Sequence, residues 1–79
     1  RGWQAVCRVS DDKEQMLVVA HTFENVPDTL ELTLPSGEVS WKSAEVFCRE
    51  GISINVENGA LTIKGLTKYD GLIILLNKM

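Results

Sequence analysis

The stretch ISINVENGALTIK, residues 52–64, carries the signal that decides the fold of this chain. Apolar and polar residues alternate on both sides of Asn58-Gly59, as they do in two strands that each bury one face. Asn-Gly is the preferred pair in two-residue hairpin loops, because both loop positions take a positive φ. Such a loop sets four flanking apolar side chains on one face in two cross-strand pairs, Val56 with Leu61 and Ile54 with Ile63. Turn chemistry and hydrophobic register therefore predict the same β-hairpin.

The rest of the chain repeats this pattern in short segments separated by turn residues. Five further strands are expected, over residues 3–10, 15–23, 29–34, 39–48 and 72–76. Turn signals recur about every 8–12 residues, including Pro35-Ser36-Gly37, and this spacing is typical of a sandwich or barrel. No segment needs a helix. The sequence therefore predicts an all-β fold, a Greek-key-like antiparallel β-sandwich of about seven strands around one core.

Three segments carry more specific expectations. Residues 15–23 have apolar side chains on both faces, which predicts a central strand that is covered on both sides, and the apolar run 72–76 predicts a buried final strand. In residues 39–48 the apolar parity changes near Lys42-Ser43, which predicts a bulge or bend there. The first strand, by contrast, alternates as a half-buried strand does.

The size and the charge of the chain limit the classes of partner that we expect. The chain has 79 residues, 44% hydrophobic and 24% charged, which are the proportions of one ordinary folded domain. Its formal net charge is -3 and its eight basic residues are scattered, so we expect neither nucleic acid nor an anionic membrane surface as a partner. The longest apolar run, residues 72–76, is far too short for a membrane helix.

The chain begins with Arg1 instead of Met, and an apolar strand follows almost at once with Trp3. We therefore expect residues 1–79 to be one domain of a larger protein. The compartment is not predicted by anything in the sequence.

Two cysteines, Cys7 and Cys48, lie in strand-like segments. Small secreted domains usually carry several bridges, so two buried free thiols are favoured over a single disulfide. A structural zinc ion takes four ligands, more than these cysteines and the lone His21 supply. No metal and no cofactor are predicted.

No residue combination in the sequence points to catalysis. The eleven carboxylates fall mostly in turns or on the polar side of strands, where water solvates them, and a glycosidase needs two of them held across a cleft. His21 as a general base would need a nucleophile beside it, and none is placed there by the pattern. No catalytic residue is therefore predicted.

Exposed aromatic rings stack on sugars as well as on other apolar surfaces. Trp3 and Trp41 begin their strands, which favours a place at the rim of the sandwich, and His21 is expected at the edge of the core or against a neighbouring domain. These three residues are the candidates for sugar contact or for a domain interface.

Several segments together resemble the C-terminal β-sandwich domain that follows the catalytic barrel in many glycoside hydrolases, above all the melibiase-type α-galactosidases and related α-glycosidases. The similarity lies in residues 2–6, 14–21, 29–35 and 65–76. The catalytic aspartates of that family belong to the barrel, so none is carried over to this chain. The resemblance implies a domain that packs against the barrel, stabilises it and borders its substrate cleft.

The leading functional hypothesis is thus a non-catalytic C-terminal domain of a carbohydrate-active hydrolase, whose partner is the catalytic domain of the same chain. Two alternatives stay open. An independent carbohydrate-binding module would use Trp3 or Trp41 as its sugar platform. An immunoglobulin-like interaction domain would instead show an exposed apolar patch and take a partner unrelated to sugars.

Overall fold

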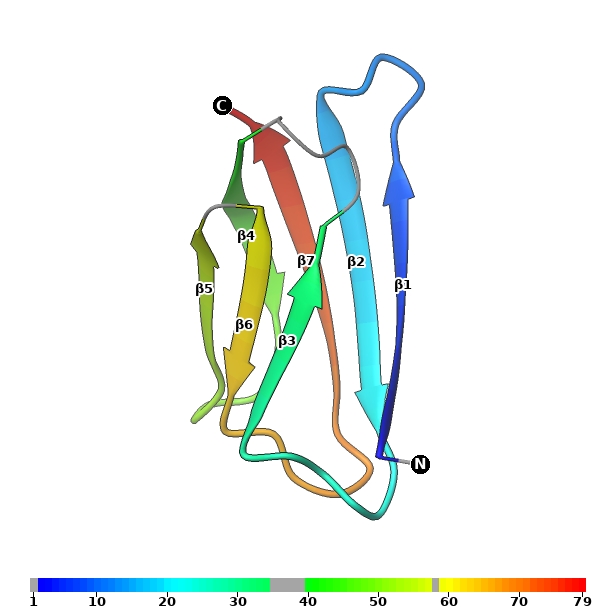
Figure 1. Cartoon of the computed structure of the whole chain (residues 1–79), viewed down its shortest axis with the longest axis vertical. Helices are drawn as coiled ribbons and strands as arrows, with labels where there is room; N and C mark the ends of the chain where they lie inside the picture. The colour runs from blue at the N-terminus through cyan, green and yellow to red at the C-terminus, as the bar shows by residue number, and fades with distance from the viewer. Residues whose placement is uncertain (1, 35–39, 58) are drawn as a thin grey trace.

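Seven β-strands account for most of the chain. A computed structural model describes residues 2–34, 40–57 and 59–79, and these contain no helix. The strands are β1 (Trp3–Val9), β2 (Gln15–Thr22), β3 (Thr29–Thr33), β4 (Trp41–Phe47), β5 (Ser53–Glu57), β6 (Ala60–Lys64) and β7 (Gly71–Lys78) (Figure 1). The predicted all-β class and number of strands are confirmed. The predicted turn at Pro35-Ser36-Gly37 lies outside the described residues.

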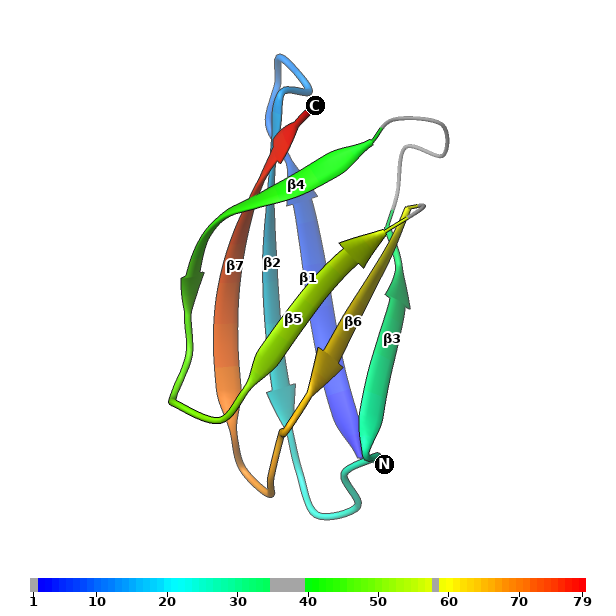
Figure 2. The ribbon, with the colours of Figure 1, turned by 90° about the vertical axis from the view of Figure 1, so that its left-hand side faces the viewer.

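The strands form two antiparallel sheets that face each other (Figure 2). One sheet has four strands in the order β1-β2-β7-β4, and the other has three in the order β3-β6-β5. The chain changes sheet after β2, β3, β4 and β6, so the last strand returns to lie between β2 and β4. This is the antiparallel β-sandwich with Greek-key-like connections that the sequence predicts.

The hairpin of β5 and β6 has the predicted register. Val56 pairs with Leu61 and Ile54 pairs with Ile63. Gly59 has a φ of 76°, the left-handed conformation that an Asn-Gly loop requires. The inward face of the three-stranded sheet is thereby fixed by the loop and by hydrophobic pairing together.

The core lies between the sheets and is built by alternate residues of the strands. The four-stranded sheet contributes β2 and β7, whose inward residues are almost fully buried, and the three-stranded sheet contributes leucines and isoleucines of β3 and β6. Its largest fully buried side chains are Met16, Val18, Leu30, Leu61, Ile63, Ile74 and Leu76. Burial of this kind contributes about 25 cal/mol per Å² of apolar surface, and it is the main stabilising term of the fold.

The expectations that β2 is covered on both sides and that β7 is buried are wrong on the outward side of the sheet. Both are central strands of their sheet, but only their inward residues are buried. On the outward side, Leu17 is 40% exposed and Ile73 is 42% exposed. The error arises because apolar residues on both faces of a strand do not by themselves show that both faces are covered.

The predicted irregularity in the fourth strand is confirmed. The pairing of β4 with β7 shifts register between Ser43 and Glu45, which is a β-bulge. Beyond the bulge Val46 pairs with Ile74 and has inward parity, yet it is 39% exposed. The edge strand β4 therefore only partly enters the core, with Trp41 as its buried end.

Candidate interaction surface

The three residues proposed for sugar contact or a domain interface lie in different settings. Trp41 is 4% exposed and is part of the core, so it is not available to a sugar ring, and this part of the prediction is wrong. Trp3 has inward parity on β1, is partly buried and packs against the core. His21 is exposed on β2, and its ring meets Phe23 edge-on with centroids 5.2 Å apart. The structure does not bring the three together.

An open pocket of about 610 Å³ lies beside Trp3. Gly2, Gln4 and Phe23 line it with the indole. Gly2 is required by its surroundings, because a Cβ there would come within 1.8 Å of the carbonyl oxygen of Asn25. Two aromatic rings and one amide thus form a small concave site at the end of β1.

The two cysteines are free, and they differ in exposure. Cys7 is partly buried on the inward side of β1, and desolvation raises the pKa of its thiol. Cys48 is exposed after the end of β4, so the expectation of two buried thiols is wrong for this residue. Cys48 follows the last residue of β4, Phe47, and lies outside the strand, whereas Cys7 lies within β1 and packs against the core.

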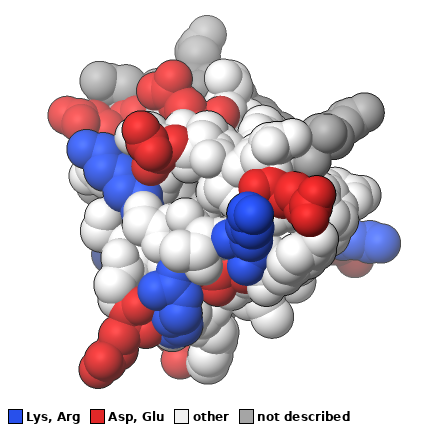
Figure 3. Space-filling view, turned by 90° about the horizontal axis from the view of Figure 1, so that it is seen from below, with Lys and Arg blue, Asp and Glu red and all other residues white. Residues whose placement is uncertain are grey.

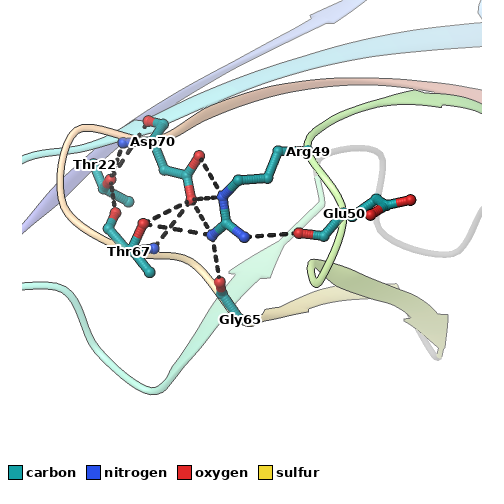
Figure 4. Close-up of polar contacts among 6 residues, drawn as sticks. All are labelled: Thr22, Arg49, Glu50, Gly65, Thr67 and Asp70. Carbon is teal, nitrogen blue, oxygen red and sulfur yellow. Dashed lines mark hydrogen bonds and ion pairs between the residues drawn. The ribbon is translucent and has the colours of Figure 1, made fainter.

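The most extensive polar cluster closes one end of the sandwich (Figure 4). Arg49 Nε and Nη2 donate to the Asp70 carboxylate, with the Nε contact to Oδ2 at 3.1 Å, and Nη2 also donates to the carbonyl of Gly65 at 2.8 Å. The Thr67 amide donates to Asp70 Oδ2 at 3.1 Å. This cluster therefore joins the loop after β4 to the loop before β7.

The same cluster satisfies the hydroxyl of Thr22, a buried polar residue that is 2% exposed. Its hydroxyl donates to the carbonyl of Thr67 and accepts the Asp70 amide N–H at 2.8 Å. Gly65 has a φ of 91°, and a Cβ there would lie 2.2 Å from the carbonyl oxygen of Gly51. The loops fit together only because glycine stands at this position.

The hydrogen bonds from Arg49 are the main cause that holds the pKa of Asp70 below its usual value, and the Thr67 amide adds to them against the effect of desolvation. In return, the carboxylate raises the pKa of Arg49. Both groups are thus fixed in their charged forms by each other. The arrangement is that of a structural ion pair, because its two side chains bond to each other and to the backbone of the neighbouring loops.

Around this end of the molecule, basic and acidic side chains alternate instead of forming a field of one sign (Figure 3). Among the described residues, no three His, Cys, Asp or Glu side chains are placed to hold a metal ion. Within the same residues, no helix is long and apolar enough to cross a membrane.

The outward side of the four-stranded sheet carries the largest departure from an ordinary protein surface. Residues that pair across neighbouring strands point to the same face, so the register defines rows that cross the whole sheet. One row, which we call the apolar row, runs over all four strands as Val6, Val19, Ile73 and Phe47. The next row, which we call the capped row, runs as Arg8, Leu17, Leu75 and Glu45. Together they form an apolar surface with one charge at each edge.

The exposure of these side chains is substantial. Val6 is 48% exposed, and Phe47, at the other end of the apolar row, is 60% exposed. A neighbouring shallow pocket of about 290 Å³ is lined by residues of β1, β2 and β7, including Arg8, Leu17 and Leu75. We call the two rows together the outer face.

The outward side of the three-stranded sheet is the opposite. Its rows contain Thr29, Lys64 and Ser53, then Glu31, Thr62 and Asn55, then Thr33, Ala60 and Glu57. An antiparallel sheet with one face in solvent normally has polar residues on that face and apolar residues on the face that covers the core. The chain applies this solution to one sheet only.

Comparison with protein-family models, with curated proteins and with solved structures finds no match.

Sequence reasoning missed the outer face, although its signal was present. The apolar residues on both sides of β2 and the apolar run of β7 were noted, and both were interpreted as buried. The register between strands, which the sequence does not specify for β1, β2, β7 and β4, is needed to see that these residues form continuous rows.

Proposed function

We propose that the domain is a non-catalytic association domain that binds a protein partner through its outer face. The observation that carries this proposal is the apolar row across all four strands, in which Phe47 is 60% exposed. The outward side of the other sheet, by contrast, is polar. Covering an exposed apolar surface with a partner removes it from water, and this lowers the free energy of the complex.

The double variant Leu17→Thr/Ile73→Thr tests this proposal. Because both side chains lie outside the core, we expect the variant to stay folded and to lose at most about 2 kcal/mol of unfolding free energy. We expect it to bind an apolar fluorescent dye such as ANS less strongly than the native domain. The matched control, Thr29→Ser/Thr62→Ser, changes two outward positions of the three-stranded sheet and should leave dye binding unchanged. A variant that unfolds, or that binds the dye as the native domain does, would contradict the proposal.

A narrower form of the proposal names the partner as the catalytic domain of a carbohydrate-active hydrolase in the same polypeptide. It is supported by the resemblance of residues 2–6, 14–21 and 70–76 to the C-terminal domains of α-galactosidases. In the longer polypeptide that this form requires, hydroxyl-radical labelling of Leu17 and Phe47 should be suppressed at every protein concentration. Labelling as strong as in the isolated domain would reject this form.

The pocket beside Trp3 favours a second candidate function, the binding of a carbohydrate. Trp3 and Phe23 offer ring surfaces to a sugar, and the Gln4 amide offers a donor and an acceptor. In an NMR titration with mono- and disaccharides, the Trp3 indole and the Gln4 side-chain amide should shift. A titration that moves neither group would eliminate this candidate.

A further inference from the structure

We infer that the outer face binds a second copy of this chain, in a symmetric dimer whose two-fold axis lies in the interface and parallel to the strands. This inference rests on the proposed function and names its partner. It follows from the order in which side chains occur along the two rows.

A two-fold axis parallel to the strands exchanges the two edges of the sheet and keeps the height along the strands. In the dimer β1 of one copy therefore lies over β4 of the other, and β2 lies over β7. Sheets that pack face to face in natural sandwiches also keep their strands nearly aligned, at about 30°. Each row then packs on the same row of the partner copy, read in reverse.

The charges of the capped row are complementary under this operation. Arg8 and Glu45 stand at opposite edges, three strand spacings or about 14 Å apart within one copy. Among the described residues, neither takes part in an ion pair. In the dimer, Arg8 of each copy meets Glu45 of the other copy, so two ion pairs flank an apolar centre of leucines.

The apolar row is also complementary to itself. Phe47, the most exposed of its side chains, lies over Val6 of the other copy, so the largest side chain meets the smallest one at that edge. Val19 lies over Ile73. In the row beyond, His21 pairs across the sheet with Gly71. The imidazole thus lies over a position that has no side chain.

The other in-plane axis, at right angles to the strands, does not give this match. It exchanges the two rows and places Arg8 against Val6 and Glu45 against Phe47. Charges set against apolar side chains lose hydration without gaining a partner. The order of residues therefore favours the axis parallel to the strands.

The size of the face indicates a weak dimer. The four strands are about 4.8 Å apart and seven or eight residues long at about 3.3 Å each, so the whole outward side of the sheet covers about 500 Å² per copy. Two copies bury about 1,000 Å², at the low end of specific interfaces. We expect a dimer with a dissociation constant of about 100 µM, populated only at high protein concentration.

Sedimentation equilibrium of two charge-reversal variants tests the arrangement, over about 10 µM to about 1 mM protein. In Arg8→Glu the new glutamate faces Glu45 of the other copy, and in Glu45→Arg the new arginine faces Arg8. Each variant alone should dimerise at least about 10-fold more weakly than the native chain. An equimolar mixture restores opposite charges at both ends, so it should form a heterodimer within about threefold of native affinity.

The matched controls are Lys64→Glu and Glu31→Arg on the outward side of the three-stranded sheet, which change the net charge by the same amounts. They should dimerise like the native chain, alone and mixed. A mixture of the outer-face variants that is no stronger than either variant alone would overturn this arrangement.

A native chain that stays monomeric to about 1 mM would overturn the inference itself. The dye-binding experiment would still test the proposed function, because it does not depend on a second copy. Suppressed labelling of Phe47 that is independent of concentration would assign the face to another domain in place of a second copy.

Discussion

The outward sides of the two sheets differ in polarity. Each row of the three-stranded sheet has one threonine and one charged residue on its outward side. The four-stranded sheet carries four apolar residues in a single outward row, Val6, Val19, Ile73 and Phe47. Both belong to antiparallel sheets that cover the same core. The difference therefore does not come from the fold, which needs only the inward residues to be apolar, and it identifies a surface that is suited to a second contact.

The largest effect is expected when the inward and outward sides of β7 are compared at two adjacent isoleucines. Ile74 is fully buried, whereas Ile73 is 42% exposed. Ile74→Ala should lower the free energy of unfolding by about 3 kcal/mol, because it leaves a cavity, and Ile73→Ala by about 1 kcal/mol or less. Urea denaturation of the two variants measures this. Equal losses would mean that the outer face is part of the core.

The Arg49–Asp70 pair should affect folding and leave association unchanged. Asp70→Ala removes the acceptor of Arg49 and of the Thr67 amide, and we expect a loss of about 1–2 kcal/mol in the free energy of unfolding. The control Glu50→Ala, in which only the backbone carbonyl of residue 50 takes part in the cluster, should change little. A loss of dimerisation in Asp70→Ala would contradict the prediction that this ion pair affects folding and leaves association unchanged.

Acid should reveal the same pair. The pKa of Asp70 is lowered in the folded state, so its contribution is complete above the unfolded value of about 3.9 and is lost as the pH falls through the folded value. The free energy of unfolding should therefore decrease below about pH 4, and less steeply in Asp70→Asn. Parallel pH profiles for both proteins would contradict this role of Asp70.

A smaller effect on stability is expected at the most exposed residue of the outer face. Phe47→Ser should change the free energy of unfolding by at most about 1 kcal/mol, because the ring is mostly in water in the free domain. The same change should weaken dimerisation by about fivefold or more, since the ring covers Val6 of the other copy. Unfolding curves at low protein concentration and sedimentation at high concentration separate the two quantities.

The smallest effect is expected on the polar sheet. Thr62→Val places one apolar side chain among polar neighbours, and we expect a change within about 0.5 kcal/mol and no gain in association. If this variant dimerised more strongly than the native chain, a single exposed apolar residue would be enough to cause association. The continuous rows of the outer face would then not be required for it.

The sequence was sufficient for the parts of the fold that depend on neighbours in the chain. The register at Asn58-Gly59 and the bulge after Ser43 are local features, because turn chemistry and parity specify them. The outer face depends on how β1, β2, β7 and β4 align, and the long separation in sequence between β2 (Gln15–Thr22) and β7 (Gly71–Lys78) hides that alignment. Trp41 and Cys48 were misplaced for a related reason, since the extent to which an edge strand is covered depends on the opposite sheet.

The most direct test of the central claim is a concentration series of backbone amide NMR spectra. We predict that resonances of residues in the two outer-face rows, such as Val19, Ile73 and Leu75, shift as the protein concentration rises, and that those of Glu31, Thr62 and Asn55 do not. Shifts confined to the three-stranded sheet, or to the pocket beside Trp3, would contradict the claim that the apolar rows are the association surface.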